Sequence, residues 1–272
     1  MILLRKCTAT KQFAQGVLLF ALWAMATLAL AGPVAGTVVH LSGPLFAKKA
    51  DGTVKVLSLK SEVENGDTLM TEKNTYALVR FIDNSEMTLK PGSTMTVENF
   101  SFDSGQQDKD QASFKLVKGG LRSVTGLLGK RSKEKFELKT PSATIGIRGT
   151  TFIAEYVGAV ALPSASAPGS NGAMLPSQGA SLAQVPAPPM PGNKPPGLYV
   201  QVLDGMVVLS NGSGAQNFAA GQFGFVPSSQ LPPVILPSNP GMQFSPPPAF
   251  HAPAQNGNTA PQQSNAVDCI VR

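Results

Sequence analysis

The feature that most constrains this fold is a series of short alternating segments between residues 34 and 157. Stretches such as TVKVLSL, YALVRFI, SFKLV and EKFELKT alternate apolar and polar residues, or nearly so, which turns one face of a strand inward and the other outward. Turn-forming dipeptides separate the apolar runs: Asp51-Gly52, Asn65-Gly66, Asp83-Asn84, Pro91-Gly92 and Asp204-Gly205. We therefore predict an all-β fold, either an antiparallel sandwich or a solenoid-like rolled sheet.

Two stretches allow more detailed predictions. In YALVRFI, alternation places Ala77, Val79 and Phe81 on one face. That face is expected to point into the core, because Arg80 on the other face is costly to bury without a partner. The segment YVQVLDGMVVLS has two β-rich arms around Asp204-Gly205, which predicts a hairpin with a two-residue type I′ turn.

Residues 1–31 have the organisation of a secretory signal peptide. Three cations, Arg5, Lys6 and Lys11, precede an uncharged run at 17–31 that ends in Ala-Leu-Ala before Gly32. The alternative is an uncleaved anchor. Fifteen residues at ~1.5 Å each reach only about 22 Å, however, short of a ~30 Å hydrocarbon core. We expect cleavage after Ala31, no stable membrane insertion afterwards, and a periplasmic or secreted product.

Loss of this leader changes the charge and the cysteine content. It leaves 19 Lys and Arg against 16 Asp and Glu, so the formal net charge falls from +6 to +3 and a nucleic-acid partner is not expected. Cys7 leaves with the leader, so no internal disulfide is expected. The remaining Cys269 is interpreted as a free thiol in a loose tail, with an intermolecular bridge as the alternative.

Proline-rich sequence divides the rest of the chain. Of the 23 prolines, 19 lie between Pro163 and Pro261. Residues 158–197 carry one charge and no aromatic residue, which predicts a disordered insertion. The β pattern resumes at 198–226. We therefore expect a β-domain at 34–226, interrupted by the insertion, and a Pro-rich disordered tail at 227–272. The tail is interpreted as a spacer, with a polyproline II ligand for a groove as the alternative.

An arginine flanked by glycines is the strongest local motif. In TPSATIGIRGTTF, Gly146 and Gly149 stand on either side of Arg148 and favour a bulge or corner of the sheet. Upstream, GLRSVTG places Gly120 and Arg122 in a similar register. The three glycines are predicted to shape turns. For both arginines, hydrogen bonding to nearby carbonyls or a carboxylate is the preferred interpretation, and contact with a partner or an anionic saccharide is the alternative.

Together with KGGLRSVTG, the segment SLKSEVENGDTLMTEKNTYALVRFIDNSEMTLKPGSTMTV and the segment YVQVLDGMVVLSN, this motif resembles the FecR domain. The resemblance covers about 34–226 without the insertion. It implies an all-β extracytoplasmic module without catalysis that contacts other proteins. Family members that regulate sigma factors have a cytoplasmic segment before a membrane helix. Only twelve residues precede Phe13, where the apolar sequence of the leader begins, so a stand-alone exported domain is expected.

Residues for catalysis or metal binding are scarce. Only two histidines are present, His40 and His251, and the second lies in the predicted tail, so no zinc cluster or histidine triad is expected. His40 is interpreted as a strand residue with an ordinary hydrogen bond. Asp83 and Glu86 are interpreted as solvated hairpin residues, and GKRSKEKFELK as a charged loop and strand edge. We expect no enzyme activity, metal or cofactor.

These observations favour a module that binds an envelope protein or a cell-wall polymer, with a possible link to envelope signalling. The alternative is a structural or adhesion scaffold that presents its proline-rich segments. The partner-binding residues predicted for the first function are Arg122 and Arg148.

Overall fold

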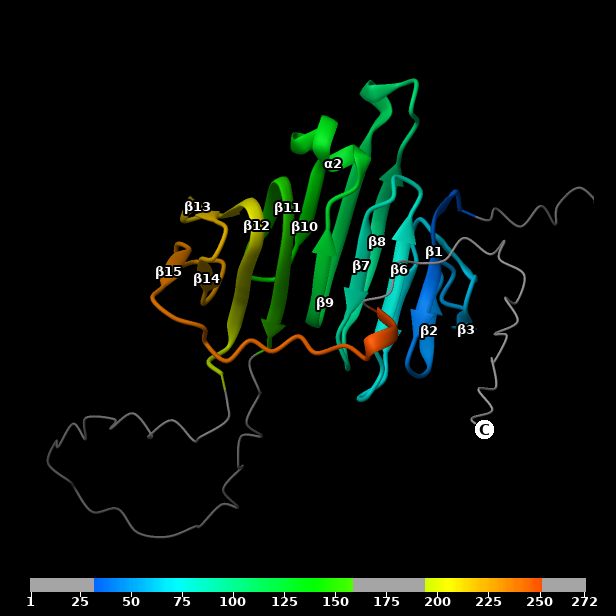
Figure 1. Ribbon diagram of the computed structural model, residues 1–272, viewed down its shortest axis with the longest axis horizontal. Helices are drawn as coiled ribbons and strands as arrows, with labels where there is room; N and C mark the ends of the chain where they lie inside the picture. Colours follow the sequence, from blue (N-terminus) through cyan, green and yellow to red (C-terminus); the bar gives the residue numbers. More distant parts are fainter. Residues whose placement is uncertain (1–31, 159–193, 251–272) are drawn as a thin grey trace, which may run out of the picture. The chain divides into compact units, whose positions relative to one another are not determined.

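The computed structural model describes residues 32–158 and 194–250 (Figure 1). The predicted signal peptide, residues 159–193 of the predicted insertion, and residues 251–272 with His251 and Cys269 lie outside the described residues. The described strands form one open sheet of 15 strands, which confirms the all-β prediction.

The strands and short helical turns have the following bounds: β1 (Val34–Leu41), β2 (Leu45–Lys48), β3 (Val54–Leu57), β4 (Glu62–Glu64), β5 (Thr68–Thr71), β6 (Ala77–Phe81), β7 (Glu86–Leu89), β8 (Thr94–Ser101), η2 (Gln107–Lys109), β9 (Gln111–Val124), α2 (Leu127–Arg131), η3 (Lys133–Lys135), β10 (Phe136–Lys139), β11 (Thr144–Val157), β12 (Gly197–Asn211), β13 (Gly214–Ala219), β14 (Phe223–Val226), β15 (Val234–Leu236) and η4 (Pro248–Phe250).

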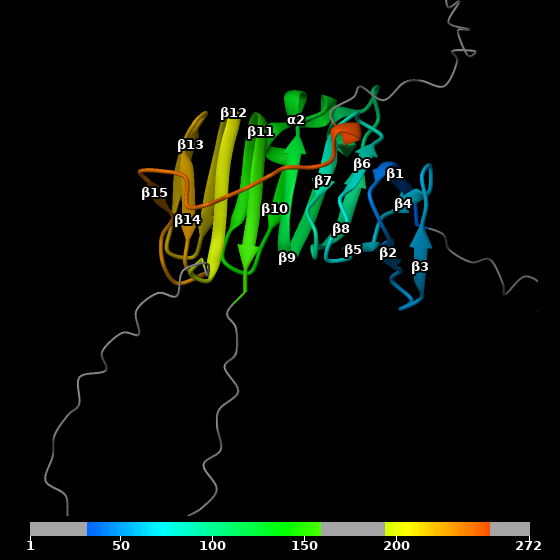
Figure 2. The ribbon, with the colours of Figure 1, turned by 60° about the horizontal axis from the view of Figure 1, so that its bottom comes forward.

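The sheet is folded over into two layers (Figure 1, Figure 2), because the long strands β9, β11 and β12 change neighbours half-way along their length. The first layer runs in the order β3, β2, β5, β8, β9, β10, β11, β12, β13. The second layer runs in the order β4, β1, β6, β7, β9, β11, β12, β14, β15. Among the described strands only β9 and β10 pair in parallel. The fold thus combines the two predicted alternatives, since one rolled sheet has halves that face each other.

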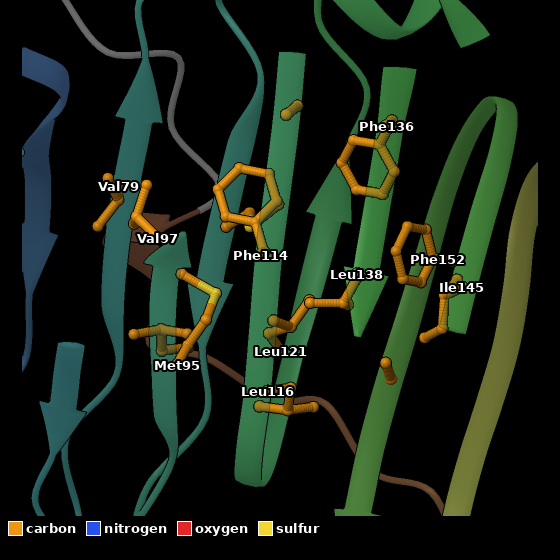
Figure 3. Packing of buried hydrophobic residues seen from close by; sticks show 14 of the residues in the cluster. Val79, Met95, Val97, Phe114, Leu116, Leu121, Phe136, Leu138, Ile145 and Phe152 are labelled. Carbon is orange, nitrogen blue, oxygen red and sulfur yellow. The ribbon is translucent and has the colours of Figure 1, made fainter. Parts of the chain in front are cut away.

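A continuous apolar core fills the space between the layers (Figure 3). Phe81 of the second layer stacks on Phe100 of the first, with ring centroids 4.9 Å apart, and meets Phe114 edge-on at 5.0 Å. Each fully buried side chain of this size contributes about 1.5–3 kcal/mol to the free energy of folding. The predicted core face of β6 is confirmed, because Ala77, Val79 and Phe81 are buried.

The long strands bend at glycines with positive φ where they pass between layers. These are Gly119 in β9 (φ 80°), Gly149 in β11 (φ 64°) and Gly205 in β12 (φ 76°). A Cβ on Gly205 would overlap the carbonyl oxygen of Gly149, and a Cβ on Gly119 would lie 2.6 Å from Ser93 Cα. Two of the bends therefore leave no room for a side chain.

The hairpin predicted at Asp204-Gly205 is wrong. β12 continues through these residues from Gly197 to Asn211, and its two halves pair with the two halves of β11. The positive φ that glycine permits at a type I′ turn serves here to bend one strand. The dipeptide fixes the local backbone conformation, but the partner strand decides whether the chain reverses.

The prediction of a loose tail is wrong for residues 227–250, which are ordered. β15 pairs with β14, and the chain then crosses the outer face of the second layer as far as Phe250 (orange in Figure 1). We call residues 237–250 the strap. Met242 of the strap belongs to a small apolar cluster with Ile153 and Tyr199. Side-chain packing therefore orders a proline-rich segment that forms few backbone hydrogen bonds.

Asp83 and the following charged run also differ from expectation. Asp83 is buried, and its carboxylate accepts hydrogen bonds from Ser85 N (2.9 Å), Ser85 Oγ (2.5 Å) and Leu128 N (3.1 Å). It thereby holds the start of α2, which together with η3 occupies most of the run predicted as a charged loop. Glu86 accepts two hydrogen bonds from Arg80, at 3.0 and 2.7 Å. Neither carboxylate is simply solvated.

Candidate binding surfaces

Arg148 is exposed on the outer face of the first layer. Ile145 and Ile147 of β11 point into the core, so Gly146 and Arg148, which alternate with them, face outward. Arg148 pairs in register with Met206 and directly precedes the Gly149 bend. The bend makes Arg148 the last outward-facing residue of this strand before the chain passes to the second layer.

An open cleft of about 420 Å³ surrounds this position. Gly146 contributes to its lining without a side chain. A Cβ at Gly146 would lie no closer than 3.9 Å to its neighbours, so packing does not require glycine there. Because Gly146 has no side chain, the cleft stays open at this position. The cleft is lined by Lys133, Glu134, Phe136, Gly146, Ile147, Arg148 and Val208.

The cleft carries more positive than negative charge. Within the described part of the chain, neither the Arg148 guanidinium nor the Lys133 ammonium group forms a hydrogen bond or ion pair, and Glu134 is the single carboxylate of the lining. The structural hydrogen bond preferred for Arg148 from sequence is therefore not formed with any described residue. Its five donors are available to a ligand.

Arg122 lies elsewhere. It is half-exposed on the second half of β9, between Thr88 of β7 and Ile153 of β11, and so faces outward from the second layer. The structure does not bring Arg122 and Arg148 together, because their side chains leave from opposite layers. Like Arg148, Arg122 has no hydrogen-bond or ion-pair partner within residues 32–158 and 194–250.

The predicted turn glycines have different roles. Gly149 has positive φ, and a Cβ there would meet nothing within 4 Å, so its backbone conformation is the constraint. Gly120 is set by close packing, since its Cβ would lie 2.8 Å from the carbonyl oxygen of Ala154. The positive-φ residue of that bend is the neighbouring Gly119, which the sequence reasoning did not select.

Comparison with protein families matches residues 67–162 to the family described as FecR protein. This chain contains a FecR domain. The matched range runs from the residue before β5 past the end of β11, so it includes Arg122, Arg148 and all residues of the cleft except Val208. β1 to β4, β12 to β15 and the strap lie outside the match, which is narrower than the resemblance at 34–226.

Solved structures that match the chain include a cell surface anchoring domain, with 22% identity, 23% of this chain and 83% of that chain covered, and a TM-score of 0.23. Two crystal structures of a protein from Parabacteroides distasonis ATCC 8503, described provisionally as an anti-sigma factor, match at 12% identity with a TM-score of 0.37. They cover 62% of this chain, which spans 57% of that protein. Curated proteins give no match.

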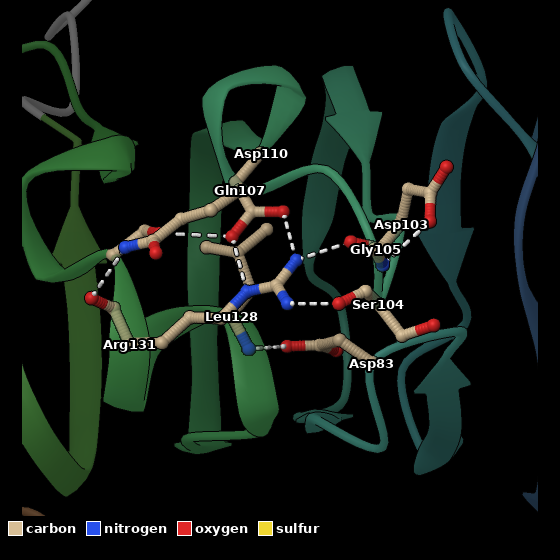
Figure 4. Close-up of polar contacts among 9 residues, drawn as sticks. Asp83, Asp103, Ser104, Gly105, Gln107, Asp110, Leu128 and Arg131 are labelled. Atoms are coloured by element: carbon tan, nitrogen blue, oxygen red, sulfur yellow. Dashed lines mark hydrogen bonds and ion pairs between the residues drawn. The ribbon is translucent and has the colours of Figure 1, made fainter.

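A different arginine of the FecR domain makes the structural contacts that the sequence reasoning assigned to Arg148. Arg131, at the end of α2, donates from Nε and Nη2 to the two carboxylate oxygens of Asp110 at 2.7 and 2.6 Å (Figure 4). Its guanidinium also donates to the carbonyl oxygens of Asp103 and Ser104 and lies 4.5 Å above the ring of Phe102. The contacts fasten α2 to the loop between β8 and β9.

Asp110 is the more deeply buried member of the Arg131–Asp110 pair. The Asp110 side chain is fully buried. Its hydrogen bonds from Arg131 hold the pKa of the Asp110 carboxyl below its ordinary value of 3.8, with help from Ser132 and against the effect of burial. The only sequence signal for the pair is an acid before β9 and an arginine after it, a spacing that does not predict contact without the fold.

A second polar group lies on the outer face of the second layer. Glu155 Oε2 accepts from Lys90 Nζ at 2.9 Å and from Lys194 Nζ at 3.1 Å. Burial alone would raise the pKa of Glu155, but the two lysines outweigh it and lower the pKa. A cavity of about 350 Å³ lies beside this group and the strap, lined by Tyr76, Lys90, Pro91, Gly119, Gly120, Glu155, Tyr156 and Gln243.

Within 32–158 and 194–250, no three His, Cys, Asp or Glu side chains lie together as they would around a metal ion. No helix of these residues is long and apolar enough to cross a membrane. His40 lacks its expected ordinary hydrogen bond at Nε2, which is buried without a partner in the described region.

Proposed function

We propose that this protein is a non-enzymatic binding module of the cell envelope that holds a negatively charged group of its partner in the Arg148 cleft. The partner is an envelope protein or a cell-wall polymer. The observation that carries this proposal is the pair of cations, Arg148 and Lys133, that face an open cleft without a partner among the described residues.

The chemistry of the cleft favours an anion. A guanidinium presents donors in a planar fork that matches a carboxylate or phosphate, and charge-assisted hydrogen bonds are about twice as strong as neutral ones. Phe136 and Val208 add apolar surface beside the charges. The lining residues include no serine, cysteine or histidine, so the cleft holds no Ser–His or Cys–His pair of the kind used in nucleophilic catalysis.

The envelope assignment is supported by the sequence. The leader at residues 1–31 has the charge and apolar pattern of a signal peptide. The FecR domain match at 67–162 supports a role related to envelope signalling, and contact with other proteins is what the resemblance implies. Signalling would follow from binding, so the test concerns binding.

The test uses the tagged full chain as bait for an envelope extract and, separately, for purified cell-wall polymer. Arg148→Ala and Lys133→Ala should each weaken capture of one stoichiometric partner without lowering the melting temperature. Lys130→Ala is the matched control, because Lys130 is an exposed cation of α2 that does not line the cleft. A scaffold would give no stoichiometric partner and would unfold when Arg148 is changed, and either result contradicts the proposal.

A further inference from the structure

The strap crosses the second layer as an extended peptide would cross a receptor. Five of its 14 residues are proline, and Figure 2 shows it running across several strands instead of beside one. Its apolar side chains anchor it at separate points. Phe244 lies edge-on to Tyr76 with centroids 6.0 Å apart, and Phe250 lies 6.2 Å from Tyr76 and 5.6 Å from His40.

The surface beneath the strap is apolar, although it is an outward face of a sheet. Ile153 and Tyr199 are 5% and 3% exposed, and Phe223 and Phe225 pack around them together with Met242 of the strap. Tyr199 stacks on Phe225 with centroids 4.6 Å apart. An outward face of an antiparallel sheet ordinarily carries polar residues, so this aromatic surface requires a cover.

Hydrogen bonds contribute little to the attachment of the strap. Within the described region, its hydrogen bonds are local: Phe250 N donates to Pro247 O, and Asn239 and Met242 exchange two. Prolines have no N–H to donate to the sheet. The strap is therefore held by β15 at one end and by apolar side chains along its length, which is the chemistry by which aromatic-lined grooves bind proline-rich peptides.

The strap also leaves part of this face unfilled. The cavity of about 350 Å³ lies beside Gln243 of the strap, between Tyr76, Lys90 and Glu155. Burial and the Glu155 charge raise the pKa of Tyr199, and Lys194 lies 5.7 Å above its ring. A ligand that follows the path of the strap would find room there for a further side chain.

We propose that the outer face of the second layer is a binding site for an extended proline-rich peptide with aromatic side chains, and that the strap occupies this site in cis. The partner supplies a proline-rich peptide with aromatic side chains, like the strap. A covalently attached competitor has a local concentration on the order of millimolar, so it weakens the apparent affinity for a peptide from outside. This site is separate from the Arg148 cleft, which lies on the other layer.

The test measures binding of a labelled synthetic peptide with the strap sequence, PSNPGMQFSPPPAF, to the full chain. The double variant Phe244→Ala and Phe250→Ala loosens the strap and should bind the peptide at least about tenfold more tightly than the unaltered chain. A peptide in which both phenylalanines are alanine should bind neither protein. Tyr76→Ala, added to the double variant, removes a receptor contact and should abolish the gain.

Two results would overturn the proposal. One is equal, weak binding by the unaltered chain and the double variant; the other is a gain that survives Tyr76→Ala. If the double variant does not fold, Met242→Ala removes a single anchor and is scored in the same way. Arg148→Ala should leave peptide binding unchanged, so failure at this site is distinguishable from failure of the function proposed for the cleft.

Discussion

Two arginines of the FecR domain, 17 positions apart in the sequence, have opposite surroundings. Arg131 donates to both carboxylate oxygens of Asp110 and to two backbone carbonyls, and it covers the ring of Phe102. Arg148 faces an open cleft, and its guanidinium forms no hydrogen bond or ion pair with a described residue. The difference shows that Gly149, and not the Arg148 guanidinium, shapes the sheet at this bend. It leaves the Arg148 side chain available for contact outside the domain.

Gly205→Ala should have the largest effect on stability. It tests whether the backbone beside the Gly149 bend, and not the Arg148 side chain, shapes the sheet. The added Cβ would overlap the carbonyl oxygen of Gly149 at a residue with φ 76°, so we expect a loss of about 3 kcal/mol of unfolding free energy. Gly149→Ala is the matched control. It has positive φ without a clash, so about 1 kcal/mol is expected from urea denaturation. Equal losses would contradict the steric explanation.

Asp110→Ala should come next, on the Arg131 side of the comparison. It removes a buried acceptor of three hydrogen bonds, from Arg131 Nε and Nη2 and from Ser132 Oγ at 2.8 Å. We expect a loss of about 2 kcal/mol in denaturant unfolding. Asp108→Ala changes an exposed acid of the same loop and serves as the control. A loss no larger than that of the control would mean that the Arg131 contacts do not stabilise the fold.

Acid should weaken the Arg131 region selectively. Because Arg131 lowers the pKa of Asp110 in the folded state, the stabilisation is complete above the unfolded value near 3.8 and is lost as the pH falls through the folded value. Below about pH 4, the melting temperature of the unaltered chain should fall more steeply than that of Asp110→Asn. Parallel curves would show that the Asp110 charge is not coupled to folding.

Arg148→Ala should have the smallest effect on stability. An exposed side chain without a partner contributes within about 0.5 kcal/mol, so the urea midpoint should stay almost unchanged. Arg131→Ala in the same experiment should lower the midpoint clearly, because it leaves the buried Asp110 carboxylate without its counter-charge. A midpoint shift at Arg148 as large as that at Arg131 would remove the contrast between the two regions.

The sequence predicts those features that depend on local periodicity. The all-β class and the inward face of β6 follow from alternation and are confirmed. The bend at Gly205 and the role of Arg131 could not be predicted in this way. The backbone conformation that Asp204-Gly205 favours suits a turn and a strand bend equally, and pairing with β11 decides between them. Arg131 and Asp110 lie 21 positions apart and meet only when the fold brings α2 against the loop between β8 and β9.

The order of the strap could not be predicted from composition. A proline-rich stretch indicates few backbone hydrogen bonds, which is correct for residues 237–250, but it does not exclude order. Met242, Phe244 and Phe250 are the signal that was missed, since each apolar side chain contacts the second layer. The structural role of Asp83 could not be predicted for a different reason. Its carboxylate accepts a hydrogen bond from Leu128 N, which lies 45 positions away in the sequence.

The three bent strands have a consequence for how the domain comes apart. β9, β11 and β12 are each continuous through both layers. If such a strand loses its pairing in one layer, its other half in the opposite layer is therefore disturbed as well. Neither layer is built only from strands of its own, because both include part of β9, β11 and β12. The described body should therefore melt as a single cooperative unit, and its assembly must wait for pairings between distant segments, a topology associated with slow folding.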